Sequence, residues 1–212
     1  MTADTTRQRN GSPRTDGGPQ IGAILLAAGQ STRFESGNKL LAPVDGTPIV
    51  RHAAETLLDA AVADVVVIVG QDDEAVRNAL SGLPVSFRVN PDYAEGQSTS
   101  VRVGVETARE RDWDAAVFAL GDMPFVDPSS VDALLDRYAS GDVSIVAAAY
   151  DGKRGNPVLF DSTHYETLAD VTGDVGGRHL IETREDTVLV ETDDPGVVRD
   201  IDDEADLAKY TD

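Results

Sequence analysis

Short, continuous apolar runs alternate along the chain with segments whose apolar residues recur every three or four positions. The apolar runs have the length of strands buried on both faces, and they lie at 21–27, 64–70, 85–89, 115–122 and 143–150. Helical spacing occupies the intervening segments 48–61, 72–82, 98–112 and 128–141. Strands that alternate with helices predict an α/β fold, a doubly wound and mostly parallel sheet.

The expected helix boundaries follow from local chemistry. Pro48 suits a first helical turn, and Gly82 follows the expected end of its helix. We expect Ser98 to cap the helix over 98–112. In such folds ligands bind at the carboxyl ends of the strands, which directs attention to the segments after Ala27 and Leu120 and to "DIDDE" at 200–204, at the end of the apolar run 197–201.

The alternation changes after Tyr150. We expect 151–160 to form a small β-hairpin laid over the sheet, and 174–185 to be helical. Two further strands are expected at 187–191 and 196–201, followed by a closing helix at 203–210. The domain is therefore expected to cover residues 21–212.

Residues 1–20 differ in composition from the rest. They are polar, contain Gly and Pro, and lack the apolar segment of a signal peptide, so we expect a disordered tail. No stretch of the chain approaches the ~20 apolar residues of a membrane span. The absence of cysteine excludes disulfides, thiolate nucleophiles and cysteine-based metal sites, and it fits a cytoplasmic location.

The charge balance excludes two classes of partner. Eighteen basic and 38 acidic side chains give a net charge of −20, which argues against nucleic acid and anionic membranes. Only three of the basic residues are lysines: Lys39, Lys153 and Lys209. A dispersed acidic surface poor in lysine is typical of a halophilic protein from a high-salt cytoplasm, the alternative being an ordinary acidic protein.

The loop after the first strand is a candidate phosphate site. Ala27, Ala28 and Gly29 have almost no side chains, so a ligand can approach the backbone, whose amides can hold phosphate oxygens. Arg33 and Lys39 follow and supply positive charge. The spacing matches neither a Walker loop nor a dinucleotide fingerprint, and a tight turn with two solvated bases is the alternative.

Carboxylates end two other apolar runs. Asp122 comes directly after the apolar residues of the fourth expected strand and suits Mg²⁺, with turn capping as its alternative role. Asp200 and Asp202 are expected on one face of a strand, where Asp202 either assists the metal or caps the last helix. His52 is expected to be structural, and Trp113 and Tyr93 are expected to be packing residues.

Several motifs in order resemble one family. "LLAAGQSTRF" (25–34), "NKLL" (38–41), "GDMPFV" (121–126), "RGNPVLF" (154–160) and "GDVGGR" (173–178) resemble the MobA-like NTP transferases that attach a nucleotide to molybdopterin. The likeness extends over residues 21–210 and is more specific in the last two motifs. It implies the nucleotidyltransferase version of the Rossmann-like fold, which is also that of the glycosyltransferase-A-like enzymes.

The resemblance also implies roles for individual residues. Arg33, Lys39 and Asp122 would be catalytic, with Asp122 and Asp202 holding Mg²⁺. The nucleotide would be bound by Leu26, Ala27, Ala28, Gly29, Arg33, Lys39, Gly96, Ser98 and Ser100. The pterin substrate would meet Asn156, Pro157, Asp174 and Arg178. Glu35 stands where many members have glycine, which leaves the path of the loop open.

Ala28 and Leu40 resemble the cytidylyl-transferring members more than the guanylyl-transferring ones. The implied reaction moves CMP from CTP to the terminal phosphate of molybdopterin and releases pyrophosphate. Guanylyl transfer, transfer to another phosphorylated acceptor, and a non-catalytic nucleotide-binding partner of a molybdoenzyme are the alternatives. A recipient molybdoenzyme is a further implied partner.

Overall fold

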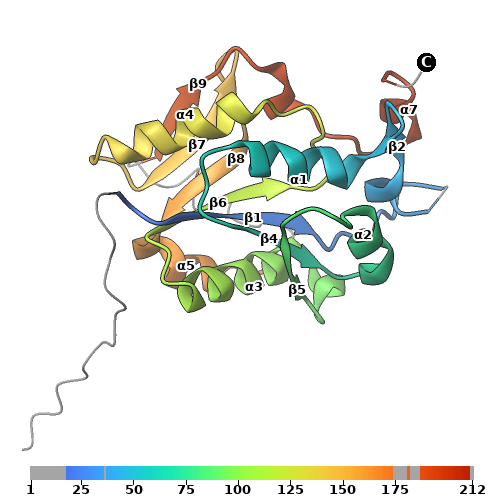
Figure 1. Cartoon of the computed structure of the whole chain (residues 1–212), viewed down its shortest axis with the longest axis horizontal. Helices are drawn as coiled ribbons and strands as arrows, with labels where there is room; N and C mark the ends of the chain where they lie inside the picture. The colour runs from blue at the N-terminus through green and yellow to red at the C-terminus, as the bar shows by residue number, and fades with distance from the viewer. Residues whose placement is uncertain (1–17, 36, 174–180, 182–186, 211–212) are drawn as a thin grey trace, which may run out of the picture.

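The computed structural model describes residues 18–35, 37–173, 181 and 187–210. A seven-stranded sheet lies between two layers of helices (Figure 1), in the order β5-β4-β1-β6-β8-β7-β9. All neighbouring strands pair in parallel except β8, which is antiparallel to both β6 and β7. The doubly wound, mostly parallel sheet is therefore confirmed. The strands are β1 (Ile21–Ala27), β4 (Val65–Val69), β5 (Ser86–Val89), β6 (Ala115–Leu120), β7 (Ile145–Tyr150), β8 (Lys153–Asp161) and β9 (Thr187–Glu191).

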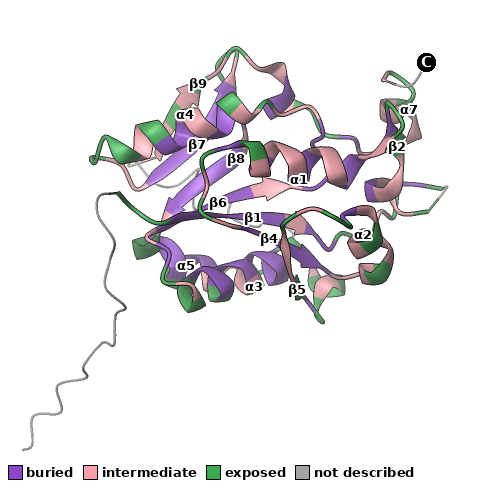
Figure 2. Ribbon diagram, viewed as in Figure 1, coloured by how far each residue is buried: buried purple, intermediate pink, exposed green. Residues whose placement is uncertain are grey.

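Residues of the continuous apolar runs are buried on both faces of the sheet. In β4, Val65, Val67 and Val69 pack into one core cluster, and Val66 and Ile68 pack into the other. All five are almost fully buried. Figure 2 shows the same burial through the central strands, with exposed positions on the outer helix faces. This two-sided burial explains why the run does not alternate with polar residues.

Helices cover both faces of the sheet. One face carries α1 (Ile49–Asp59), α2 (Asp73–Ala79) and α4 (Pro128–Ala139), and the other carries α3 (Gln97–Glu110) and α5 (Tyr165–Ala169). Among the residues that the structure describes, the shorter elements are the pair β2 (Pro43–Val44) and β3 (Thr47–Pro48), the closing helix α7 (Glu204–Leu207), and the 3₁₀ turns η1 (Lys39–Leu41), η2 (Tyr93–Glu95), η3 (Ser162–His164) and η5 (Pro195–Val198).

The expected hairpin after Tyr150 is present, but it does not lie over the sheet. Strands β7 and β8 are joined by Asp151 and Gly152, whose φ angles of 51° and 70° suit a tight hairpin turn. Strand β8 then enters the main sheet between β6 and β7. The buried residues of β8 therefore belong to a central strand of the sheet, and not to a hairpin packed on top of it.

Two other local expectations were wrong. Gly96, with φ at 115°, is the N-cap of α3, and Ser98 lies one residue inside the helix with 1% exposure. The segment 196–201 is not a strand, because residues 195–198 form η5. Gly196 packs so closely on the Phe125 carbonyl that a Cβ there would overlap it.

Some expectations fall outside the described residues. The tail is described only from residue 18, and the helix expected at 174–185 is described only at Ile181. Across the described ranges, every helix is too short or too polar to span a bilayer.

Candidate functional site

A large cavity lined by the predicted loops opens at the carboxyl ends of β1 and β6. Leu26 and Leu120 pair at the ends of these strands, and β1 lies at the centre of the parallel part of the sheet. The chain passes from β1 to β4 on one side of β1, and later forms β6 on the other side. The strand order thus reverses at β1, and the crevice at such a point is the usual ligand site of the fold. Its volume is about 400 Å³, and its lining is Leu26, Ala28, Gly29, Gln30, Ser31, Thr32, Arg33, Lys39, Leu40, Tyr93, Gly96, Gln97, Ser100, Leu120 and Asp122.

The loop that precedes Lys39 is fixed by side-chain hydrogen bonds. Ser31 adopts a left-handed conformation (φ 51°), and its Oγ accepts the Lys39 amide at 3.1 Å. Asn38 caps η1 by accepting the Leu40 amide at 3.0 Å, and its Nδ2 donates to Asp72 at 3.3 Å. These contacts set the direction in which Lys39 leaves the loop.

Lys39 bridges two carboxylates at the floor of the cavity. Its Nζ lies 2.7 Å from Asp122 Oδ2 and 3.1 Å from Asp202 Oδ1. Arg33 reaches Asp202 Oδ2 at 2.9 Å from the solvent side. Burial alone would lower the pKa of the Lys39 ammonium, but the two carboxylates outweigh it and raise that pKa, so Lys39 stays charged at neutral pH.

Backbone contacts bring Asp122 and Asp202 together from distant parts of the chain. The Gly121 amide donates to Leu26 O at 2.9 Å, which ties the loop after β6 to β1. The Ile201 amide donates to Asp122 O at 3.0 Å, which ties the segment before α7 to the same loop. A larger residue at Gly121 would press on this contact, since a Cβ there would lie 3.0 Å from Leu26 O.

The sequence left two roles open for Asp202, metal binding and capping of the last helix, and the structure gives the capping role to its neighbour. Asp203 caps α7 by accepting the Asp206 amide at 2.9 Å, so Asp202 is free to pair with Lys39 and Arg33. Residues 199–203 are not in a strand, so the expected strand alternation of Asp200 and Asp202 was wrong.

The carboxylates fit a divalent cation that is shared with a ligand. Asp122 Oδ1 is buried, and among the described residues nothing donates a hydrogen bond to it. The described residues contain no group of three or more His, Asp or Glu side chains arranged around a metal position. Mg²⁺ is commonly held by one or two carboxylates together with phosphate oxygens of the substrate, and Asp122 with Asp202 matches that pattern.

The other end of the cavity carries little charge. Helix α3 begins there at Gly96 without a capping side chain, so its amides and its positive dipole end are open to a ligand. Tyr93, which we expected only to pack, lines the cavity and also covers Gly70, where a Cβ would lie 2.7 Å from the Tyr93 Cβ. Buried Asn90 donates to Thr99 Oγ1 and Ser100 Oγ at 2.8 and 2.9 Å and fixes the first turn of α3.

Most of the predicted nucleotide and catalytic residues lie around this one cavity. The residues brought together are Leu26, Ala28, Gly29, Arg33, Lys39, Gly96, Ser100 and Asp122, with Asp202 joined through Lys39. Ala27 and Ser98 do not line it: Ala27 packs in the core, and Ser98 is buried within α3. Glu35 is exposed and does not line the cavity either.

The lining also includes residues to which the sequence analysis gave no role. These are Gln30, Ser31, Thr32, Gln97 and Leu120. Gln30, Ser31 and Thr32 lie within the motif at 25–34, Gln97 lies between Gly96 and Ser98, and Leu120 precedes the motif at 121–126, so closeness to the predicted residues was the available signal.

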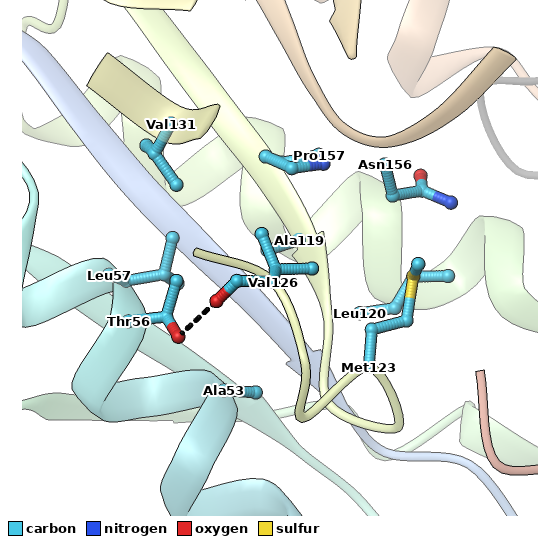
Figure 3. Close-up of a pocket in the computed structure, with 10 residues that line it drawn as sticks. All are labelled: Ala53, Thr56, Leu57, Ala119, Leu120, Met123, Val126, Val131, Asn156 and Pro157. Atoms are coloured by element: carbon cyan, nitrogen blue, oxygen red, sulfur yellow. Dashed lines mark hydrogen bonds between the residues drawn. The ribbon is translucent and has the colours of Figure 1, made fainter. Parts of the chain in front are cut away.

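Two predicted acceptor residues line a different, smaller cavity. Asn156 and Pro157 meet Met123 and Leu120 there (Figure 3), in a space of about 10 Å³ between β8, α1 and the loop after β6. The remaining lining is mostly apolar and is braced by Thr56, whose Oγ1 donates to Val126 O at 2.8 Å. Leu120 borders both cavities. Asp174 and Arg178 lie outside the described residues.

His52 and Trp113 have structural roles, as expected. The His52 Nε2 lies 2.9 Å from Val44 O and joins α1 to β2. Trp113 is buried over Gly22, where a Cβ would overlap its ring.

Known proteins resemble the chain in sequence and in fold. Nicotine blue oxidoreductase from Paenarthrobacter nicotinovorans is 30% identical over 87% of this chain and 93% of its own length. A probable molybdenum cofactor guanylyltransferase from Natronomonas pharaonis is 35% identical over 58% of this chain and 59% of its own length. The crystal structure of Rv0371c from Mycobacterium tuberculosis in complex with manganese superposes with a TM-score of 0.75, at 25% identity, and the match covers 90% of this chain and 97% of that one.

Coverage differs widely among the relatives. Bifunctional GlmU proteins are matched at 32–34% identity, but the chain spans only 27–30% of their length. The sequence profile of the MobA-like NTP transferase domain matches residues 23–188, which include most of β1, the Lys39 loop, Asp122 and most of the sheet. With this match across most of its length, the chain belongs to the MobA-like NTP transferase family of nucleotidyltransferases.

Proposed function

We propose that this protein transfers CMP from CTP to the terminal phosphate of molybdopterin and releases pyrophosphate. The observation that carries the proposal is the cluster of Lys39, Asp122, Asp202 and Arg33 at the charged end of a cavity of about 400 Å³. The triphosphate would lie at this end, and the nucleoside would extend toward Tyr93, Gly96 and Ser100. A cytoplasmic location is part of the same proposal.

The chemical problem is to bring an anionic acceptor to an anionic triphosphate. A terminal phosphate is already ionised near neutral pH, so the reaction needs no general base. Its oxygen forms a bond to the α-phosphorus, and the bond between that phosphorus and the bridging oxygen of pyrophosphate breaks. Lys39 and Arg33 offset the charge of the leaving pyrophosphate, and the amides around Gly29 hold the phosphates in line.

Asp122 and Asp202 would hold Mg²⁺, which supplies further charge neutralisation at the phosphates. The buried, unpartnered Asp122 Oδ1 supports this role, and a relative of similar fold has been solved with manganese. Asn156 and Pro157 would meet the pterin if the small cavity beneath them widens on binding.

CTP is proposed as the donor because Ala28 and Leu40 resemble the cytidylyl-transferring members more than the guanylyl-transferring ones, and both residues line the cavity. GTP is the second candidate, because one relative is named as a probable molybdenum cofactor guanylyltransferase.

A second class of function is favoured by one relative. The nicotine blue oxidoreductase matches 87% of this chain, so oxidoreductase activity on that dye is the second candidate class. Reduction of nicotine blue by NADH or NADPH in the presence of the protein would support it.

The direct test is pyrophosphate release from each of the four NTPs, with Mg²⁺, in the presence and absence of molybdopterin. We expect release only with CTP and molybdopterin. Release with GTP alone among the four would replace the cytidylyl assignment with the guanylyl one. Nucleotide binding without release under any condition would favour a non-catalytic partner of a molybdoenzyme, and release only with a sugar phosphate as acceptor would favour a different acceptor.

Asp122→Ala tests the carboxylate at the centre of the cluster. We expect turnover to fall by about 100-fold or more, since charge stabilisation at the phosphates is lost. The fold should persist, because Asp122 is held by its backbone contacts. Activity is followed by pyrophosphate release and folding by circular dichroism; near-normal turnover in a folded variant would exclude the role.

A further inference from the structure

Lys39 occupies the carboxylate oxygens that a divalent cation would need. Its ammonium contacts Asp122 Oδ2 and Asp202 Oδ1, and Arg33 contacts Asp202 Oδ2. Of the four carboxylate oxygens, only Asp122 Oδ1 has no hydrogen-bond partner among the described residues. Without nucleotide, Lys39 and Arg33 therefore offset the charges of Asp122 and Asp202, and a third carboxylate, Asp200, lies close enough to interact with Lys39 and Asp202.

The two cations are not equivalent. The Lys39 side chain is 13% exposed, whereas that of Arg33 is 69% exposed. Arg33 can move into solvent at little cost and contacts only one of the two carboxylates. Lys39 bridges both carboxylates, and its backbone is fixed by Ser31 and η1. Lys39 is thus the group that a metal must displace.

We infer that Lys39 closes the metal site in the nucleotide-free protein and opens it by moving to the triphosphate. A divalent cation that arrives alone would have to displace the ammonium and leave it buried without a counterion, which is costly. A cation that arrives with a nucleotide brings phosphate oxygens to which the ammonium can turn. Metal and nucleotide then favour each other's binding, and the coupling is reciprocal. This inference rests on the proposed metal role of Asp122 and Asp202, but not on the identity of the nucleotide or of the acceptor.

The test is Mn²⁺ binding to the nucleotide-free protein, followed by the electron paramagnetic resonance signal of free Mn²⁺. We expect Lys39→Met to bind Mn²⁺ at least about tenfold more tightly than the unchanged protein, because the competing charge is gone. Arg33→Met is the matched control, for which we expect a change of less than about threefold. Asp122→Asn should abolish the tight site in the Lys39→Met background.

The inference is overturned if Lys39→Met and the unchanged protein bind Mn²⁺ equally without nucleotide. Should Lys39→Met fail to fold, Lys39→Gln keeps a polar group between the carboxylates, and the rise in melting temperature on adding Mn²⁺ should be larger for it than for the unchanged protein. An equal rise in both would also overturn the inference. These readouts need no turnover, so a failure of the proposed cytidylyl transfer would leave them unchanged.

Discussion

At the scale of single residues, the site depends on glycines placed for two different reasons. Gly70 lacks a side chain because Tyr93 and Ala28 fill the space above it, where a Cβ would lie 2.7 and 2.9 Å from their Cβ atoms. Gly29 has open space in front of it, with nothing within 4 Å of a Cβ position, yet it lines the cavity. The absence of a side chain at Gly70 is required for packing within the protein, whereas its absence at Gly29 leaves space that a ligand can occupy.

Substitution by alanine should therefore change protein stability at Gly70 and nucleotide binding at Gly29. Gly70→Ala should lower the free energy of unfolding by about 1–3 kcal/mol through overpacking. Gly29→Ala should leave it within about 0.5 kcal/mol and weaken nucleotide binding, because the added methyl enters the ligand's space. Urea unfolding and CTP titration measure the two quantities. Loss of stability in Gly29→Ala with unchanged CTP affinity would contradict the assignment.

At the scale of elements, η5 connects the Asp202 segment to α4. Asp194 Oδ2 accepts hydrogen bonds from the Asp127 amide and the Ser130 hydroxyl at 2.8 and 2.9 Å, and its Oδ1 accepts the Gly196 amide at 2.7 Å. Ser130 is 2% exposed, so its hydroxyl depends on this partner. The contact holds the chain that leads to Asp202.

Asp194→Ala should therefore affect both stability and the site. We expect a loss of about 2–3 kcal/mol, because a buried hydroxyl and two amides lose their acceptor. Asp127→Ala, which removes only the exposed N-cap of α4, is the control and should cost about 1 kcal/mol. Urea unfolding gives both values, and Mn²⁺ affinity in the presence of CTP should fall only in Asp194→Ala. Equal effects of the two substitutions on both quantities would contradict this role.

The elements that the sequence predicted well were those with strong, local signals. The two-sided apolar runs and the regular helical spacing placed β1, β4, β6, α1 and α4 within a few residues. The path of β8 into the sheet was not predictable, because strand pairing is decided by distant partners. The segment at 196–201 was apolar enough for a strand, but close packing of Gly155 and Gly196 against other backbone instead favours a tight turn.

The site was predicted in part for the same reason. Lys39, Arg33 and Asp122 are charged residues that follow predicted buried strands in the sequence, and all three line one cavity in the structure. The role of Tyr93 in the lining and the contact of Lys39 with both carboxylates depend on how separate loops meet, which no local pattern records.

At the scale of the whole molecule, the net charge of −20 is the dominant property. The excess acidic side chains repel one another at low ionic strength, and salt screens this repulsion. The sequence-based proposal of a halophilic protein predicts that the free energy of unfolding is larger in molar KCl than in dilute buffer. Chemical unfolding by urea, an uncharged denaturant, measures it at both salt concentrations. Greater stability in dilute buffer would contradict the proposal.

The position of a bound nucleotide tests the functional proposal most directly. A crystal soaked with CTP and Mn²⁺ would locate the metal by its anomalous scattering and the triphosphate by its density. We predict that Mn²⁺ lies on the Asp122 carboxylate, that the triphosphate runs from the Gly29 loop to this metal, and that the Lys39 ammonium has turned toward the phosphates. A triphosphate bound elsewhere, with Lys39 still between Asp122 and Asp202, would contradict it.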